Sequence, residues 1–430
     1  MTIINRQNIK TANLTHIVKI FLKKKKAILK SIRMHQTPFY LFDKGQLIHD
    51  LDVFRKVFSQ KMPGFKPFYA LKINHYEKIV EETIKHGYGL DVASGKELNM
   101  ALHYSCNDIL FYSPGKSDEE LELAVKNNQR VRINIDSFDE LEKIGHLTNK
   151  LKSRIGVGIR IHLRSMPQWV KFGIDIDDLH KFWQKARKYP YVNLGGIHFH
   201  ASRNKNSEAY VLSVKELGNY LTKHFSKSDL ESIKYIDFGG GFEPYASEGY
   251  YPYEFSQDAT VNSDSSYDDV KKRFSSIYKI REALPLAEYA NQISAALQKY
   301  LVPHLNVQYY AEPGRIICNN AMHIVLSVRD IKDNKVCILD GGINMVGWQR
   351  YMYEYFPLIN LTHPALREIA YTLYGRLCTT RDIWGYTCYA AKIKRGDIIL
   401  VPNQGALTYS IAQNWIMPVP KVFGLYEKLP

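Results

Sequence analysis

Short apolar runs alternate with charged, helix-like segments along most of this 430-residue chain. Strands and helices in such alternation are typical of parallel β/α units. The apolar runs that we expect to form barrel strands are residues 67–74, 88–92, 109–112, 131–135, 155–161, 195–200, 235–238 and 307–311. About eight units in one run favour an α/β fold of the (β/α)8 TIM-like barrel class over an open doubly wound sheet, because no GxGxxG motif opens the first helix.

The pattern changes on both sides of the predicted barrel, which we place at residues 43–315. Residues 1–36 form a basic N-terminal extension, in which 14–34 carry apolar residues at helical spacing. Residues 37–42 read as a strand. Residues 316–430 contain β-rich segments separated by turns, so we expect a second, mostly β domain there. An insertion at about 245–278, rich in tyrosine, serine and aspartate, is expected to be a long loop on the barrel.

Composition limits the partners and the compartment of the chain. Lysine and arginine exceed aspartate and glutamate, 58 against 43, and the net charge of +15 favours an anionic ligand or cofactor. No zinc-finger spacing or basic, aromatic RNA-binding signature accompanies that charge, so we predict no nucleic-acid partner. No apolar run approaches the roughly 20 residues of a membrane span, and no signal-peptide pattern is present, so we predict no membrane partner. Five widely spaced cysteines without a CxxC pair indicate a reducing, cytoplasmic location.

Lys72 lies near the carboxyl end of the run from Pro67 to Asn74, where a barrel builds its site. Partial desolvation there would lower the pKa of the Lys72 ammonium group, and the neutral amine could form a Schiff base with a carbonyl cofactor. The alternative is a strand-end lysine that reaches into solvent. The run by itself favours that alternative, and the choice depends on the ends of the later strands.

Three later strand ends carry groups that could bind a cofactor. The glycine triplet 239–241 lets backbone amides approach an anion closely, although a plain glycine turn is the alternative. Arg315 can bind a phosphate and Glu312 can keep a ring nitrogen protonated, although both could instead belong to a surface ion pair. His198 and His200 share one side of a strand, but no carboxylate or third histidine stands nearby in the sequence. We therefore predict no metal site, and favour the stacking of one imidazole on an aromatic ring.

Together these groups describe a site for a phosphorylated pyridine aldehyde, and the chain resembles the fold-type III pyridoxal-phosphate decarboxylases, the family of ornithine, arginine and diaminopimelate decarboxylases. The resemblance runs from Thr37 to about Asn414. Its motifs, in chain order, are Tyr69-Ala70-Leu71-Lys72, Gly89 to Leu98, Asp136-Ser137, His198 to His200, Gly239 to Gly241, Glu312 to Arg315, Asp340-Gly341-Gly342, Leu377-Cys378 with Asp382, and Gly405-Ala406. Their number and order favour the Schiff-base interpretation of Lys72.

The resemblance implies roles for these residues. Pyridoxal 5'-phosphate would be the cofactor, and the catalytic residues would be Lys72, His200 and Cys378. Lys72 would bond to the aldehyde, His200 would stack on the ring and Glu312 would face the ring nitrogen. Cys378, from the neighbouring subunit, would return a proton to the substrate after carbon dioxide leaves. Gly239, Gly240, Gly241 and Arg315 would hold the phosphate, and Ser202 and Gly314 would also bind the cofactor. Thr379 and Asp382 would bind the substrate.

The family architecture implies a barrel and a β domain paired as a homodimer, with both active sites at the interface. Residues 37–42 would then form a strand that joins the β domain.

Three positions depart from the family pattern. Thr379 follows the catalytic cysteine, where ornithine and diaminopimelate enzymes carry an acidic residue that reads the distal part of the substrate. Leu407 stands in place of the tyrosine of the phosphate-binding GAY motif. Ala201 replaces the glycine of the HxGS motif, which leaves open whether Ser202 or Arg203 reaches the phosphate.

These features predict a lyase that decarboxylates a basic or diamino acid, or its acylated conjugate, in siderophore or polyamine biosynthesis. The missing acidic reader beside Cys378 favours an acylated substrate such as a citryl conjugate. Diaminopimelate or ornithine decarboxylase proper is an alternative, and so is a non-catalytic homologue that binds the cofactor. An amino-acid racemase is a further alternative, although racemases of this fold use a tyrosine base and lack the Leu377-Cys378 motif.

Overall fold

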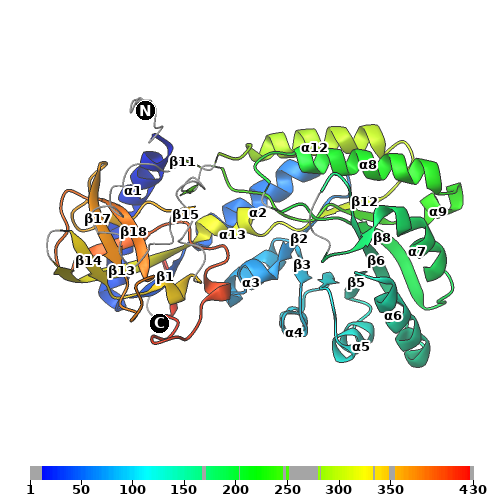
Figure 1. Ribbon diagram of the computed structural model, residues 1–430, viewed down its shortest axis with the longest axis horizontal. Helices are drawn as coiled ribbons and strands as arrows, with labels where there is room; N and C mark the ends of the chain where they lie inside the picture. Colours follow the sequence, from blue (N-terminus) through cyan, green and yellow to red (C-terminus); the bar gives the residue numbers. More distant parts are fainter. Residues whose placement is uncertain are drawn as a thin grey trace. The chain divides into compact units, whose positions relative to one another are not determined.

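The computed structural model describes residues 12–166, 171–202, 204–245, 248–250, 279–280, 282–332, 335–347 and 354–426. These residues form two compact units, whose elements are labelled in Figure 1. Unit 1 contains the described residues of 1–47, 244–282 and 318–430, and unit 2 contains those of 48–243 and 283–317. Unit 2 is thus inserted into the sequence of unit 1.

Unit 2 is a closed parallel barrel with helices around it (Figure 1). Its strands, in ring order, are β2 (Lys66–Ala70), β3 (Gly89–Val92), β4 (Ile109–Tyr112), β5 (Val131–Ile135), β6 (Ile155–His162), β8 (Val192–His198), β9 (Tyr235–Asp237) and β12 (Gln308–Ala311). The ring closes because β5 pairs with both β4 and β6, and the short β7 (Ile174–Asp175) pairs with β6 outside it. The predicted (β/α)8 barrel is confirmed.

Aromatic rings from three strands fill the barrel interior. The ring of Tyr310 lies 4.6 Å from that of Tyr235 and 4.9 Å from that of Phe68, measured between centroids. Gly158 and Gly196 make room for Tyr235, since a Cβ atom would come within 2.4 Å of its hydroxyl at Gly158 and within 2.0 Å of its ring at Gly196. The barrel is therefore a packed core rather than a pore, and a ligand site belongs at the strand ends.

Helices follow the barrel strands, and serine residues fix where several of them begin. Helices α4, α5 and α6 each follow a serine, at Ser94, Ser117 and Ser137, whose side chain accepts a hydrogen bond from the backbone nitrogen three residues later. The helices assigned here are α2 (Lys44–Ser59), α3 (Glu77–Lys85), α4 (Gly95–His103), α5 (Asp118–Lys126), α6 (Phe138–Leu151), α7 (Leu179–Ala186), α8 (Glu208–His224), α9 (Lys227–Ser232) and α12 (Leu286–Tyr300). Because these caps lie just beyond the strand ends, they also fix the loops that border the barrel mouth.

Unit 1 is built on a mixed sheet, as expected for a mostly β domain. The sheet order is β14 (Val336–Leu339), β17 (Glu368–Tyr374), β18 (Ile383–Tyr389), β16 (Ile359–Asn360), β19 (Ile398–Val401), β13 (Met322–Lys332), β1 (Phe39–Phe42) and β20 (Val422–Gly424). β1 runs antiparallel to β13 and parallel to β20. The first strand of the chain is thus part of the sheet of unit 1.

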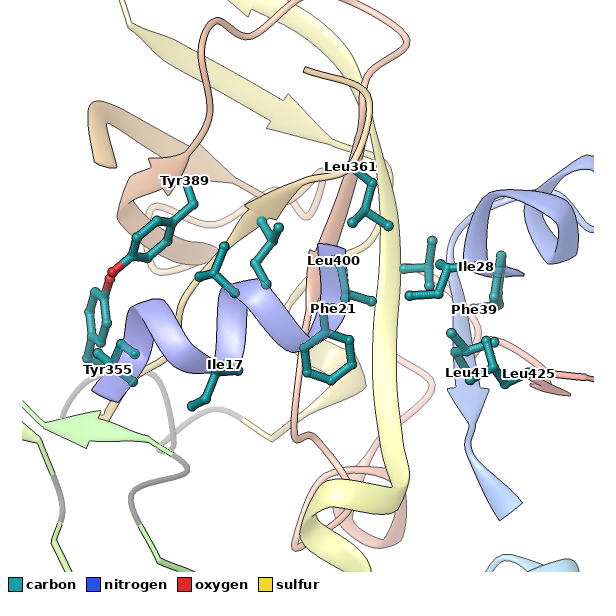
Figure 2. Close-up of a cluster of buried hydrophobic side chains, with 14 residues drawn as sticks. Ile17, Phe21, Ile28, Phe39, Leu41, Tyr355, Leu361, Tyr389, Leu400 and Leu425 are labelled. Atoms are coloured by element: carbon teal, nitrogen blue, oxygen red, sulfur yellow. The ribbon is translucent and has the colours of Figure 1, made fainter. Parts of the chain in front are cut away.

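Helix α1 (Ala12–Met34) packs its apolar side on this sheet. Phe21 and Ile28 of the helix are buried in one cluster with Leu41 and Leu400 of the sheet, as Figure 2 shows. The side chains of Lys23 and other lysines remain exposed along the helix. The amphipathic pattern of this segment therefore serves packing within unit 1.

The predicted insertion at 245–278 lies mostly outside the described residues. Its described part includes β10 (Gly249–Tyr250), which pairs with β11 (Lys279–Ile280) and with β15 (Glu354–Tyr355). Because β15 belongs to unit 1, these residues group with unit 1, whereas the sequence placed the segment on the barrel. Among the described residues, no helix is long and apolar enough to cross a membrane.

Candidate active site

A cavity of about 230 Å³ opens at the carboxyl ends of the barrel strands in unit 2. Its lining comprises Lys72, Ala93, Tyr112, Ser113, Pro114, Arg160, Phe172, His200, Ser202 and Glu312. Four of these, Lys72, His200, Ser202 and Glu312, are residues that the sequence singled out. The fold therefore gathers groups from strands far apart in the chain into one site.

Lys72 lies in a short 3-10 turn (Leu71–Ile73) that directly follows β2, so the strand ends four residues earlier than the sequence pattern indicated. Its Nζ donates to Oδ2 of Asp91 over 2.8 Å, and 40% of its side chain is exposed. Burial opposes the ammonium charge, but the carboxylates of Asp91 and Glu312 outweigh it and raise the pKa of Lys72. The expected lowering of this pKa is therefore wrong for the protein without its ligand, because two acids face the lysine.

Asp91, at the end of β3, is fully buried beside Lys72. Burial, followed by the negative charge of Glu312, raises the pKa of Asp91 to about 7, and the Lys72 ammonium acts in the opposite direction. A carboxyl group with such a pKa can accept or release a proton near neutral pH. Asp91 is thus a base placed against the amine that must lose a proton before it can attack an aldehyde.

Glu312 follows β12 and is almost fully buried between two imidazoles. Nε2 of His198 lies 3.4 Å from Oε1 of Glu312, and Nδ1 of His200 lies 3.2 Å from Oε2. Burial opposes ionisation, but the two histidines and Lys72 outweigh it and hold the pKa of Glu312 well below its usual value. The fold therefore supplies an ionised carboxylate inside the site.

The sequence argument against a metal site assumed that no carboxylate stands near the two histidines. The fold corrects this, because donor atoms of His198, His200 and Glu312 all lie within 4.8 Å of one another. Burial lowers the pKa of His200 to about 4, so its ring is neutral near pH 7. A neutral imidazole at the cavity wall suits stacking against an aromatic ring, which is the role the family resemblance implies.

The glycine triplet after β9 lies where no larger residue fits. A Cβ atom would lie 2.7 Å from the carbonyl oxygen of Phe199 at Gly239, 2.3 Å from that of Glu312 at Gly240, and 2.1 Å from that of Ala201 at Gly241. Gly239 and Gly241 also have positive φ values of 71° and 92°.

The triplet is also tied to His200. The backbone nitrogen of Gly240 lies 3.1 Å from Nδ1 of His200, so the loop is pressed against the ends of β8 and β12.

Gly314 and Arg315 follow β12 closely in the chain. A Cβ atom at Gly314 would come within 2.4 Å of the Ile73 side chain, so this glycine allows close packing on the turn that holds Lys72. The Arg315 side chain is 10% exposed, and its Nε lies 3.7 Å from Oε2 of Glu243. Arg315 is thus a largely buried cation held near a carboxylate at the end of β12.

Three predicted site residues lie in unit 1. Cys378 is exposed on the turn between β17 and β18, whereas the other four cysteines of the chain are buried. Thr379 is half-buried on the same turn, where its backbone nitrogen donates to the carbonyl of Leu377 over 2.8 Å. Asp382 is 1% exposed, and its two carboxylate oxygens accept the backbone amides of Ile343 and Leu377 over 2.8 and 2.7 Å.

Asp382 therefore holds the Cys378 turn in place. A role in substrate binding, as the sequence predicted, would compete with these two backbone hydrogen bonds.

The strand-end motifs did not point to Arg160, Tyr112 or Asp237. Arg160 lies on β6, in the run Ile-Gly-Val-Gly-Ile-Arg-Ile-His of residues 155–162. Strict alternation in that run puts the isoleucines and Val157 on one face and Arg160 on the other, interior face, which is the signal that could have identified it. Asp237 ends β9 fully buried, and burial together with Glu312 raises its pKa well above the usual value.

The residues present fit the groups of pyridoxal phosphate. Among the described residues, Oε1 of Glu312 and Oδ1 of Asp91 are buried without a hydrogen-bond partner. An ionised carboxylate with an unused oxygen suits a protonated ring nitrogen, and an amine at the cavity suits an aldehyde. Arg315 is a largely buried cation that suits the phosphate group, and the glycines after β9 allow backbone to approach a ligand closely.

Comparisons with known proteins show which family this chain belongs to. The pyridoxal-binding domain model of the pyridoxal-dependent decarboxylases matches residues 48–267. The chain is 24% identical over 408 residues to the 2-[(L-alanin-3-ylcarbamoyl)methyl]-2-hydroxybutanedioate decarboxylase of Staphylococcus aureus, which covers 90% of this chain and 93% of that protein. It is also 24% identical over 397 residues to the diaminopimelate decarboxylase of Aquifex aeolicus, which covers 89% of this chain and 84% of that protein.

A similar fold occurs among solved structures. The diaminopimelate decarboxylase of M. jannaschii matches with a TM-score of 0.76 at 22% identity, over 92% of this chain and 88% of that one. Because the family model spans just over half of the chain and its relatives align along most of the rest, the chain belongs to the pyridoxal-dependent decarboxylases and is a carboxy-lyase whose cofactor is pyridoxal 5'-phosphate.

Proposed function

We propose that this amino-acid decarboxylase acts on a substrate whose side-chain amine is acylated by a group that carries carboxylates. The observation that carries the proposal is Thr379, a neutral residue beside Cys378 where diamino-acid enzymes of the family place an acid. A substrate ammonium would find no anionic partner in Thr379, and a substrate carboxylate would meet no repulsion from it.

Two further observations support the acylated substrate. The net charge of +15 raises the local concentration of anionic molecules around the protein. The relative from Staphylococcus aureus is named for an alanine unit linked through a carbamoyl group to a hydroxybutanedioate. Its substrate therefore joins an amino acid to a dicarboxylate, which is the chemical class proposed here.

The cofactor, when bound, supplies an electron sink for the pair of electrons left by carbon dioxide. In this proposal Glu312 keeps a proton on the ring nitrogen through its unused Oε1. His200 lies against the ring as a neutral imidazole, and Asp91 takes the proton that the Nζ of Lys72 gives up. The glycine triplet and Arg315 bind the phosphate.

The proton that replaces carbon dioxide comes, in this proposal, from the Sγ of Cys378. The thiol is exposed on its turn, and its S–H group can serve as a general acid. Following the family architecture, we infer that it serves the barrel of a second copy of the chain, so that each active site is shared by a homodimer.

The decisive experiment compares carbon dioxide release from ornithine, lysine, arginine, diaminopimelate and their citryl conjugates under one set of conditions. We expect the highest kcat/KM for a conjugate, because only the conjugates lack a distal ammonium and carry extra carboxylates. The preference should weaken as salt is raised, since screening reduces attraction between the protein and an anionic substrate. A highest kcat/KM for a free diamino acid at every salt concentration would refute the proposal.

Decarboxylation of diaminopimelate is the second candidate. It is favoured by the relative from Aquifex aeolicus, which is as similar in identity as the relative from Staphylococcus aureus. Diaminopimelate carries a distal ammonium beside its distal carboxylate, so this reading requires an acid other than residue 379 to bind the ammonium. The same assay separates the two candidates.

A further inference from the structure

Arg160 lies inside the barrel mouth without a role in the reaction described so far. It is near the carboxyl end of β6, where it pairs in register with His198 of β8. The residue is 9% exposed, and it lines the same cavity as Lys72 and Glu312. Its guanidinium is therefore removed from bulk solvent and borders the ligand space.

Two aromatic rings lie against this guanidinium. The Cζ atom of Arg160 lies 4.5 Å from the ring centre of Tyr112 and 4.6 Å from that of Phe172. Gly173 lets the loop that carries Phe172 close onto Arg160, because a Cβ atom at Gly173 would lie 2.7 Å from the carbonyl oxygen of Arg160. The two ring centres are 6.4 Å apart and the ring planes are tilted by 53°, so the rings lie on adjacent sides of the guanidinium rather than on its two opposite faces. The N–H groups on the sides that the rings leave uncovered can bond to a ligand in the cavity.

No ion pair between Arg160 and a carboxylate occurs within the part of the chain that the structure describes. The Tyr112 hydroxyl donates to Oδ1 of Asp136 over 2.6 Å. Tyr112 thus stands between Arg160 and the carboxylate of Asp136. The arginine side chain stays protonated, and burial of a charge without an opposite charge beside it costs free energy. The cavity therefore favours the binding of an anion.

We propose that Arg160 binds an oxyanion of the molecules held in the cavity, other than the cofactor phosphate. The phosphate is assigned to the glycine triplet and Arg315, which follow β9 and β12, whereas Arg160 comes from β6. Two oxyanions remain available: the ring hydroxyl oxygen of the cofactor in its ionised form, and a carboxylate of the substrate. A carboxylate bound by Arg160 would be one that the substrate retains, because an arginine paired with the departing carboxylate would stabilise the ground state and slow decarboxylation.

The inference rests on the cofactor that the family uses. The possibility that Arg160 binds a substrate carboxylate also rests on the proposed function. The test therefore measures cofactor binding in the absence of substrate. Apoprotein of the wild type, Arg160→Gln and Arg160→Lys is titrated with pyridoxal phosphate, followed by absorbance and by quenching of protein fluorescence. Arg132→Gln is the matched control, because Arg132 lies on the neighbouring strand β5 and is paired with Asp108 away from this cavity.

If the cofactor supplies the oxyanion, Arg160→Gln weakens pyridoxal phosphate binding about tenfold to a hundredfold, the usual range for a lost charge-assisted hydrogen bond. The absorbance of the bound cofactor then also changes its pH dependence. If the substrate supplies it, cofactor affinity stays at the wild-type value and KM for the best substrate rises by the same factor, with a smaller change in kcat. Arg160→Lys keeps the charge but not the stacked plane, so we expect an intermediate effect.

Phe172→Leu provides a second variant, which retains the arginine and removes one of the two aromatic rings beside it. Loss of the Phe172 ring, which lies 4.6 Å from Cζ of Arg160, should shift the same constant as Arg160→Gln by a smaller factor. Circular dichroism with thermal melting checks that each variant is folded. The proposal is overturned if a folded Arg160→Gln protein shows cofactor affinity and KM within about twofold of the Arg132→Gln control. A KM raised for every substrate class with normal cofactor binding, ornithine included, would also overturn the proposal, because ornithine has no carboxylate other than the departing one.

Discussion

The ion pair of Lys72 with Asp91 makes cofactor capture depend on pH. Because the pKa of Lys72 is raised, its amine is protonated at neutral pH and becomes reactive only as pH rises. Asp91→Asn removes the carboxylate that favours the ammonium form, so the amine should become reactive at lower pH. We expect the rate at which borohydride traps pyridoxal phosphate on Lys72, measured by mass spectrometry, to rise at a lower pH in Asp91→Asn than in wild type.

Two controls accompany this measurement. Lys72→Ala should give no trapped adduct at that site, and Asp108→Asn, which changes a carboxylate paired with Lys66 and Arg132, should keep the wild-type profile. Identical pH profiles for Asp91→Asn and wild type would show that Asp91 does not govern the proton on Lys72.

Asp237 is expected to be a neutral carboxylic acid in the working enzyme. It is fully buried, its Oδ1 accepts the backbone amide of Gly239 over 2.9 Å, and burial with Glu312 raises its pKa well above the usual value. An amide has the shape of the neutral acid, so Asp237→Asn should keep cofactor affinity and kcat within about threefold. Glu312→Gln, which removes an ionised group, should lower kcat by at least about tenfold.

The comparison is made by spectroscopic titration and steady-state kinetics on both proteins. Equal losses in Asp237→Asn and Glu312→Gln would mean that Asp237 works in its ionised form.

The site residues at the strand ends could be predicted from the sequence, whereas the contacts between side chains of different strands could not. Lys72, His200 and Glu312 follow strands whose ends must meet in a barrel, so their gathering at one cavity could be expected. The raised pKa of Lys72 could not, because it depends on Asp91 and Glu312, which the fold alone brings together. Asp382 shows the same limit, since its partners Ile343 and Leu377 are set by loop folding.

At the scale of elements, the turn between β17 and β18 presents Cys378, and Asp382 determines its shape. Asp382→Ala would leave two buried backbone amides, those of Ile343 and Leu377, without an acceptor. Each lost acceptor costs about 1–3 kcal/mol. We expect a lower free energy of unfolding by chemical denaturation, and faster modification of Cys378 by a thiol reagent in native protein.

Thr380→Ala, an exposed position on the same turn, is the matched control and should change neither quantity. The thiol readout is clean because the other four cysteines are buried. Unchanged stability and thiol reactivity in Asp382→Ala would return Asp382 to the list of candidate substrate-binding residues.

Elements with strong periodicity were predictable, and those defined by distant pairing were not. The alternation of strands and helices predicted the barrel, because the strands are short and apolar and several are followed by serine-capped helices. The two-residue strands β10 and β11 carry no such pattern. They pair with each other, and β10 also pairs with β15, more than 100 residues away in the chain. A local pattern cannot report a partner of that kind.

At the scale of the whole molecule, a shared active site predicts recovery of activity between two inactive variants. If Lys72 and Cys378 serve one site from two subunits, Lys72→Ala and Cys378→Ala proteins each have two defective sites per dimer. Random exchange of subunits gives mixed dimers with one intact site, so roughly a quarter of all sites should recover. Carbon dioxide release from the mixture, after exchange is demonstrated with labelled subunits, checks this.

Mixing either variant with itself under the same conditions is the control. No recovery despite proven exchange would show that both residues act from a single chain.

The parallel pairing of β1 with β20 has a consequence for synthesis on the ribosome. Phe42 is made long before its partner Gly424, and the complete barrel of unit 2 is translated between them. At roughly 5–20 residues per second, the early strand waits on the order of 20–80 seconds for its late neighbour, while the barrel has time to fold first. During that interval the apolar side of α1 is not yet covered by the sheet on which it packs in the folded protein. The nascent chain is therefore a natural client for chaperones that shield exposed apolar helices, and moving residues 12–42 to follow β20 in a circular permutant would remove the wait.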